Sequence, residues 1–178
     1  MVPVLGLVAL AAVGIAVAAQ NWSVHLTGDQ EVPPPGVVIE TQAQGQASFH
    51  LSKDGEALRY KLNVANIENV FMAHIHCGPP TTNGPIAVWL YPSTAPVAGP
   101  TGQGRIQGRI AAGVITDADV RPLAASATCP GGVSDLEDVL EHISNGNAYV
   151  NVHTNDGVAP TNTGAGDFPG GEIRGNLP

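Results

Sequence analysis

Positive charge is scarce in this sequence, which has seven Lys and Arg against fifteen Asp and Glu and a formal net charge of −8. We expect no nucleic-acid partner, because such binding depends on Lys and Arg side chains that contact phosphates. Common catalytic motifs are missing as well: no Ser-His-Asp order, phosphate-cradling glycine loop or paired-carboxylate motif stands out. Hydrolase and nucleotide-binding functions are therefore disfavoured.

Charged residues are absent from the first nineteen positions, which are almost wholly apolar and end in Val17-Ala18-Ala19. An apolar run that ends in small residues resembles a signal peptide, here cleaved after Ala19. The usual positive start is missing, so an uncleaved membrane anchor is the alternative, and only that alternative gives the protein a membrane contact. In both cases we expect one domain over residues 20–178, in a secreted, periplasmic or cell-surface location.

Cysteine occurs only twice, at Cys77 and Cys129. An oxidising compartment favours a disulfide between them, which is our prediction. The alternative makes Cys77 a metal thiolate, although strand alternation directs its side chain away from His74 and His76. A redox-active pair is less favoured still, since no CxxC spacing is present.

Most of the chain consists of short segments of strand character, divided by Gly, Pro and Asn turns. The clearest alternation of apolar and polar residues lies at 57–64, and an Asp-Gly turn joins it to a strand at 44–51. The other predicted strands cover 23–27, 70–76, 86–91, 104–111, 148–153 and 171–177. Eight strands of this length predict an all-β, antiparallel, Greek-key-like sandwich or barrel. One short helix interrupts them, with a capping box at Ser134 and Glu137 and an end at Asn145-Gly146.

Two of the predicted strands carry histidines at a spacing that suits metal binding. His74 and His76 lie two positions apart, so both point to one face of their strand. On the strand at 148–153, His153 shares a face with Tyr149 and Asn151. If the two strands are close together, three imidazoles converge, and neutral imidazole nitrogens suit copper or zinc. We therefore predict a metal site at His74, His76 and His153, with copper favoured over zinc; the alternative is that all three are structural, hydrogen-bonded residues.

Further side chains near these strands are candidate ligands or supports. Met72 precedes His74 by two residues on the same strand face, so its thioether either serves as a soft fourth ligand or packs. Asp156 and Asp167 follow His153 and could supply an oxygen ligand or a carboxylate that fixes an imidazole tautomer. The remaining histidines are expected to be surface or structural residues: His25, His50 and His142.

Five sequence segments occur in a specific order: HLTGDQEVPP at 25–34, AHIHCG at 73–78, NGPI at 83–86, YVNVHT at 149–154 and PGGEIRG at 169–175. Together, over roughly residues 22–177, they resemble the CHRD domain, a family first described in chordin. The resemblance implies an extracellular or periplasmic β domain and transfers little chemistry. Among these motif residues, Glu31 and Glu172 are available to pair with Arg174 and to fasten the first strand to the last.

The order of the three histidines is also similar to that of copper/zinc superoxide dismutases, Greek-key sandwiches in which a His-x-His strand and a later strand histidine hold copper. His74, His76 and His153 match that order and strand placement. The following loop has no histidine to bridge copper to zinc, and no ordered set of zinc ligands is present. The resemblance therefore implies a mononuclear copper site rather than a dinuclear one.

Three functional hypotheses follow from these patterns. The first, and the favoured one, is an exported, non-catalytic copper-binding domain that stores, carries or buffers the ion. The second is a copper-dependent redox enzyme similar to superoxide dismutase, which requires an open coordination position that substrate can reach. The third is an extracellular interaction or matrix module with a protein partner, in which the histidines are structural.

Overall fold

The computed structural model describes residues 20–92 and 104–178, and the predicted signal segment at 1–19 lies outside them. All eight predicted strands are present, with ends that differ by a few residues. They are β1 (Asn21–Thr27), β2 (Gln44–Leu51), β3 (Leu58–Ile67), β4 (Val70–Cys77), β5 (Ile86–Tyr91), β6 (Ile106–Ile115), β7 (Ala148–Thr154) and β8 (Ile173–Asn176). One α-helix, α1 (Leu136–Ser144), and two short 3-10 helices, η1 (Gly28–Gln30) and η2 (Asp117–Asp119), complete the described part.

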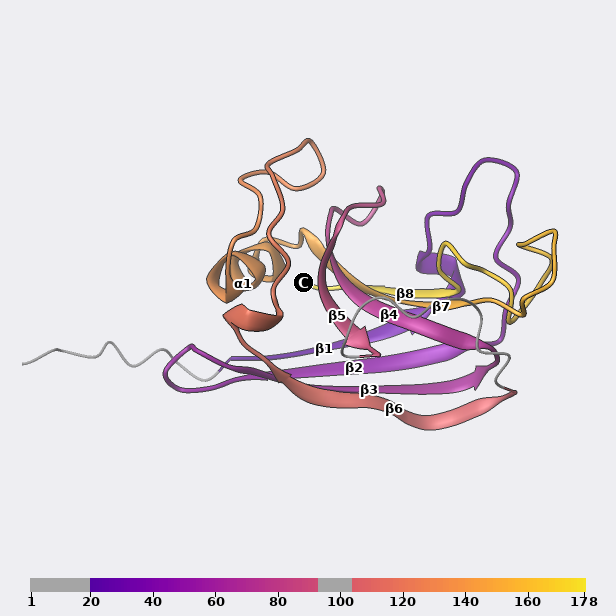
Figure 1. The fold of residues 1–178 in the computed structure, drawn as a ribbon, viewed down its shortest axis with the longest axis horizontal. Helices are drawn as coiled ribbons and strands as arrows, with labels where there is room; N and C mark the ends of the chain where they lie inside the picture. Colours follow the sequence, from indigo (N-terminus) through magenta and orange to yellow (C-terminus); the bar gives the residue numbers. More distant parts are fainter. Residues whose placement is uncertain (1–19, 93–103) are drawn as a thin grey trace, which may run out of the picture.

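The strands form one antiparallel sheet in the order β5-β4-β7-β8-β1-β2-β3-β6. The two edges of this sheet approach each other (Figure 1). A bridge between Val88 and Val120 joins β5 to the segment that follows β6, and the Tyr60 hydroxyl on β3 donates to the Leu90 carbonyl on β5 at 2.9 Å. The sheet is therefore a nearly closed barrel, one of the two predicted architectures.

Strand alternation fills the interior of this barrel. On β3, Leu58, Leu62 and Val64 are buried, whereas the intervening Arg59 and Lys61 are exposed. β4 and β7 differ because every residue of β7, and the last five of β4, are buried. One face of these two strands therefore packs in the core, and the other is covered by connecting segments.

The helix begins one residue later than the capping pattern predicts. Asp135 is the N-cap, and its carboxylate accepts from the Asp138 backbone N–H at 3.1 Å. The Asp138 carboxylate in turn accepts from the Ser134 backbone N–H at 2.7 Å. The predicted box of Ser134 with Glu137 is therefore wrong by one position, because a carboxylate is a stronger acceptor for helix N–H groups than a hydroxyl.

A disulfide joins Cys77, at the end of β4, to Cys129, ahead of α1. The predicted pairing is confirmed, and the alternative of a Cys77 metal thiolate is wrong because the sulfur is already bonded. The bond closes a separation of 52 residues, which stabilises the fold by about 4 kcal/mol on the chain-entropy estimate. It is compatible with a location outside the cytoplasm. Among the described residues, no helix has the length and apolar character needed to cross a membrane.

Two long connections lie together at one end of the barrel, and α1 lies at the other end (Figure 1). They are residues 28–43, after β1, and 155–172, between β7 and β8. A third connection, residues 78–85, joins β4 to β5. These three connections supply the contacts that cover the polar face of β4, β7 and β8.

Candidate metal centre

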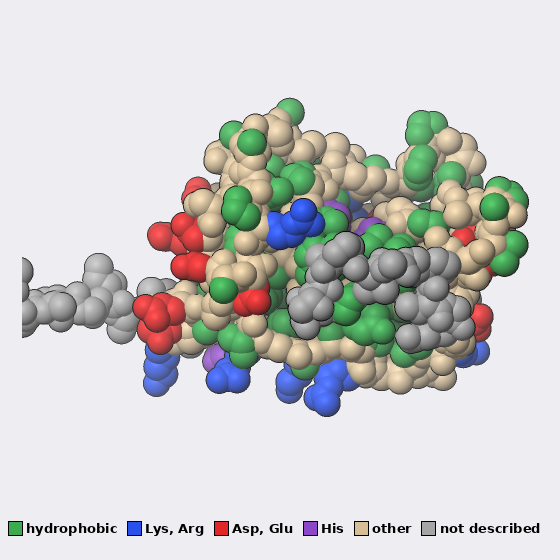
Figure 2. All heavy atoms as spheres, viewed as in Figure 1, with side chains coloured by type: hydrophobic (Ala, Val, Ile, Leu, Met, Phe, Trp, Pro, Cys, Tyr) green, Lys and Arg blue, Asp and Glu red, His purple; other side chains and the backbone are tan. Residues whose placement is uncertain are grey.

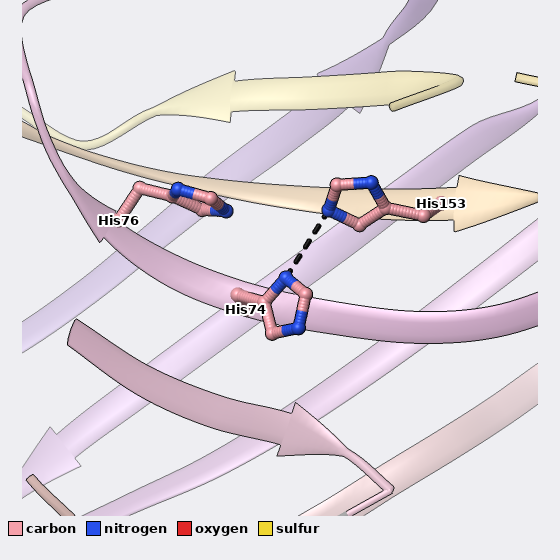
Figure 3. A group of neighbouring side chains, drawn as sticks. All are labelled: His74, His76 and His153. Atoms are coloured by element: carbon pink, nitrogen blue, oxygen red, sulfur yellow. Dashed lines mark hydrogen bonds between the residues drawn. The ribbon is translucent and has the colours of Figure 1, made fainter. Parts of the chain in front are cut away.

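The pairing of β4 with β7 brings the predicted histidines together. Its register sets Met72 opposite His153, His74 opposite Asn151 and His76 opposite Tyr149. Because directly paired residues leave a sheet on the same side, these side chains share one face. Figure 3 shows the three imidazoles facing one another from the two neighbouring strands. The predicted convergence of His74, His76 and His153 is thus present.

The distances within the cluster are close to those of a metal centre. His74 Nδ1 lies 3.1 Å from His153 Nε2, and one ring nitrogen of each histidine lies within 4.8 Å of the other two. Metal–imidazole bonds of about 2.0–2.1 Å place ligand nitrogens roughly 3–4 Å apart. Shifts of less than about 1 Å would therefore bring all three nitrogens to a single ion.

Two backbone carbonyls fix the tautomers of His76 and His153. The Nδ1–H of His76 donates to the Gly84 carbonyl at 2.8 Å, and the Nδ1–H of His153 donates to the Pro169 carbonyl at 2.8 Å. Each ring therefore keeps an unprotonated Nε2 for the cluster. A histidine that donates its second ring N–H to a backbone carbonyl is the arrangement that metal-binding histidines adopt.

Three polar atoms of the cluster have no hydrogen-bond partner within the described chain: His74 Nε2, His76 Nε2 and Asn151 Oδ1, all of them buried. A buried acceptor without a partner destabilises a protein by about 1–3 kcal/mol. Asn151 was not predicted as a site residue. Strand alternation places it on the histidine face, and its position opposite His74 makes its amide oxygen a candidate for a further metal ligand.

Burial keeps the three histidines neutral at pH 7. His74 is fully buried, and His76 and His153 are 7% and 5% exposed. Burial is the largest cause that lowers the pKa of His74 to about 2, and the neighbouring His153 lowers it further. Burial likewise lowers the pKa of His76 and His153 to about 4, against the opposing effects of the carbonyls of Gly84 and Pro169. Neutral imidazole is the form that binds metal ions.

Gly84 holds the connection between β4 and β5 against the site. Its carbonyl accepts from His76, and its N–H donates to the Tyr149 hydroxyl at 3.0 Å. A Cβ atom at this position would lie 1.8 Å from the Cys77 carbonyl oxygen. Only glycine fits, which gives a physical reason for the glycine of the NGPI motif.

Arg174 supports the same connection from β8, and not through the predicted ion pairs. It donates to the Asn83 side chain at 3.1 Å and to the Pro79 carbonyl at 2.8 Å. Its guanidinium also lies 3.4 Å from the centroid of the Tyr149 ring, and that ring is stacked on His76 at 4.7 Å. Arg174 is thus linked to His76 both through a ring stack and through the Gly84 connection.

The predicted pairing of Glu31 and Glu172 with Arg174 is wrong. Glu172 accepts instead from Thr41, Thr154 and Gly166. Glu31 Oε1 is buried without a hydrogen-bond partner in the described chain, and burial raises the pKa of Glu31 to about 8, against the opposing charge of Arg174. Arg174 thus acts on Glu31 through its charge, whereas its hydrogen bonds go to carbonyls and amides.

The other predicted residues have varied outcomes. The half-buried Met72 lies opposite His153 across the strand pair, which keeps it on the histidine face, and its role as a ligand stays a prediction. Asp156 and Asp167 accept from residues of their own loop, from Val158 and Thr163. Backbone carbonyls, not these carboxylates, fix the tautomers of His76 and His153, and the alternative role of either carboxylate as an oxygen ligand stays a prediction. His25 and His50 are exposed, and His142 bonds to Gly132 and Asn147.

The fold and this cluster define a disulfide-linked β-barrel domain whose three neutral histidines lie beneath connecting loops. The family model of the CHRD domain matches residues 22–177, nearly the whole chain, and the protein belongs to the CHRD domain family. No curated protein and no solved structure matches it. The family resemblance of the sequence is thereby confirmed.

Proposed function

We propose that this protein binds a single copper ion through His74, His76 and His153, and that it stores, carries or buffers copper outside the cytoplasm. The observation that supports this most directly is the pair of hydrogen bonds from His76 and His153 to backbone carbonyls, at 2.8 Å each. They leave two buried Nε2 lone pairs beside the third imidazole. Borderline nitrogen donors favour copper and zinc over magnesium or calcium.

Copper uptake would replace the hydrogen bond between His74 and His153. In the metal-free protein, His153 Nε2 accepts from His74 Nδ1–H, because the proton of His153 is on Nδ1. If both nitrogens were to hold an ion, the proton on His74 Nδ1 would have to transfer to Nε2 of the same ring, which has no partner in the described chain. All three imidazole ligands would remain neutral, and neutral imidazole is a suitable ligand for both copper(I) and copper(II). Asn151 Oδ1 and the Met72 sulfur are the candidate fourth ligands on the same face.

Low exposure favours storage or transport over redox turnover. The three rings are between 0% and 7% exposed, which leaves room for an ion to enter by small movements and little room for a substrate at an open coordination position. Superoxide dismutation is therefore the second candidate. The order of His74, His76 and His153 in the sequence, which is similar to that of copper/zinc superoxide dismutases, supports this second candidate. A rate of superoxide turnover above that of free copper would favour it.

The test is a titration of the purified protein with copper(II), and with copper(I) under anaerobic conditions, beside a His74/His76/His153 triple-alanine variant. The matched control replaces the two exposed histidines, His25 and His50, by alanine. We expect one tight site in the wild type and the control and none in the triple variant, with circular dichroism to confirm folding. If the wild type binds no copper more tightly than the triple variant, the proposal is wrong. A second variant, His153→Gln, preserves side-chain polarity and should still lose the site if the larger change prevents folding.

A further inference from the structure

The scarce positive charge of this protein is concentrated on one side of the barrel. Of the seven Lys and Arg in the chain, three point outward from β3 and β6, one immediately precedes β6 and one lies in the turn between β2 and β3. These five residues are Arg59, Lys61, Arg109, Arg105 and Lys53. Figure 2 shows Lys and Arg side chains along the lower edge of the molecule, below β3 and β6.

Acidic residues are excluded from the strands that form this side. None of the strands of the described chain contains Asp or Glu, so the carboxylates belong to the connections and the helices. The outward positions of β1, β2, β3 and β6, which we call the basic sheet face, thus carry cations, neutral polar groups and a few apolar residues such as Val114, and no carboxylate. In a protein with a net charge of −8, these four strands thus carry three cations, Arg59, Lys61 and Arg109, and no carboxylate.

The register arranges the polar groups of the basic sheet face in rows across the strands. One row pairs Ser23 with Ser48 and Lys61, and the next pairs His25 with Gln46 and Asn63. A shallow depression of about 260 Å³ lies in the second row. Hydroxyl and amide groups therefore stand between the cations, at positions where a ligand rich in hydroxyls can form hydrogen bonds.

Protection of a sheet edge does not explain the cations of β3. Edge strands often carry Lys to prevent pairing with other chains. β3 lies between β2 and β6, and its backbone pairs on both sides. Arg59 and Lys61 are therefore not edge protection, and their spacing of two residues places them roughly 7 Å apart along the strand.

From this arrangement we propose that the basic sheet face binds an acidic polysaccharide, a chain that carries sulfate or carboxylate groups among its hydroxyls. The cations Arg59, Lys61 and Arg109 match repeated negative charge, and the amides and hydroxyls near them match sugar hydroxyls.

Single-stranded nucleic acid fits less well, because it needs exposed aromatic rings for stacking, and Trp22, Phe49 and Tyr60 of these strands are partly or fully buried. A membrane fits less well because Val114 is the one exposed large apolar residue on these strands in the described chain. The proposal is independent of copper.

Heparin immobilised on a sensor surface is the probe, applied at low ionic strength and in the presence of a chelator. We expect the full chain to bind heparin and not neutral dextran, with an affinity that falls as salt rises. The variant Arg59→Gln/Lys61→Gln/Arg109→Gln should bind at least tenfold more weakly. The matched control is Arg121→Gln, which removes an exposed cation away from these strands and should bind as the wild type does.

Three outcomes would overturn the proposal: no heparin binding by the wild type, equal losses in the triple variant and the control, or tighter binding to a single-stranded DNA oligonucleotide or to phosphatidylglycerol vesicles than to heparin. The substituted side chains are exposed, so the variant should unfold at the wild-type temperature. If it does not fold, the single variants Lys61→Gln and Arg109→Gln carry the test, each with a smaller loss. Because the site histidines are unchanged, copper binding by the same variants separates this result from that of the metal proposal.

Discussion

Acid should destabilise the metal-free protein through its three buried histidines. In the unfolded chain a histidine has a pKa of 6.5, whereas the folded protein lowers it to about 4 at His76 and His153 and to about 2 at His74. Between pH 6.5 and 4 the unfolded chain therefore binds protons that the folded protein does not bind. The free energy of unfolding must fall as the pH falls through this window.

The magnitude follows from the proton balance. Each proton that only the unfolded state binds changes the free energy of unfolding by about 1.4 kcal/mol per pH unit. Between pH 6 and 5 the unfolded histidines are mostly protonated and the folded ones mostly neutral, which gives a loss of about 1 kcal/mol per histidine and roughly 3 kcal/mol for three. The effect fades above pH 6.5, where the unfolded histidines also lose their protons, and it should be nearly absent above about pH 7.5.

Urea unfolding at pH 7, 6 and 5, in the presence of a chelator, measures this loss. A His74/His76/His153 triple-glutamine variant should lack it, and the exposed His25→Gln variant should retain it. The reasoning fails if the difference in stability between wild type and triple variant changes by less than about 1 kcal/mol from pH 6 to pH 5. Should the triple variant not fold, NMR titration of the wild-type imidazoles is decisive, since rings that protonate near pH 6.5 would contradict the argument.

Three further predictions concern the residues around the site. Gly84→Ala should destabilise the protein by at least about 3 kcal/mol in urea unfolding, because its Cβ would collide with the Cys77 carbonyl; a change below 1 kcal/mol would contradict this contact. Glu31→Gln should stabilise the protein increasingly as the pH rises from 4.5 to 8, since the folded state holds a proton on Glu31 that the unfolded state releases; thermal unfolding at pH 5 and 8 measures it, and equal effects at both would refute it. Arg174→Gln should raise the affinity for copper(II) relative to copper(I) by about tenfold, because the positive charge that acts on His76 disfavours the higher charge of the ion; Arg174→Lys should keep the wild-type ratio of the two affinities while destabilising the fold, and an unchanged ratio in the glutamine variant would oppose this role.

Local sequence patterns were sufficient to predict the strands and the strand faces on which the histidines lie. Alternation alone places His74 with His76, and His153 with Asn151, on single strand faces. Which strands are neighbours could not be predicted in the same way. β4 and β7 are more than seventy residues apart, and their pairing depends on the closure of the whole barrel.

The supports of the cluster were predicted less well than the cluster itself. A carboxylate was expected to orient His153, and the Pro169 carbonyl does so. Arg174 was expected to bind carboxylates, and it binds carbonyls, an amide and an aromatic face. Backbone carbonyls belong to every residue, so no sequence pattern marks the ones that a side chain will reach.

The ordered motifs of the family gain a common explanation from these contacts. The NGPI motif supplies Gly84, which orients His76, and the PGGEIRG motif supplies Pro169, which orients His153. Arg174, which also belongs to the PGGEIRG motif, donates to Asn83 of the NGPI motif and lies over the Tyr149 ring that is stacked on His76.

Two buried ring nitrogens of this cluster, His74 Nε2 and His76 Nε2, have no hydrogen-bond partner within the described chain. A purely structural cluster would be expected to pair its buried nitrogens, since each unpaired one destabilises the fold by about 1–3 kcal/mol. Here the carbonyls of Gly84 and Pro169 each engage one nitrogen of a ring and leave the other directed into the cluster, where His153 Nε2 accepts from His74 and His76 Nε2 has no partner in the described chain. Residues distant in sequence thus cooperate to keep lone pairs available at one point, which is the property that a bound copper ion would use.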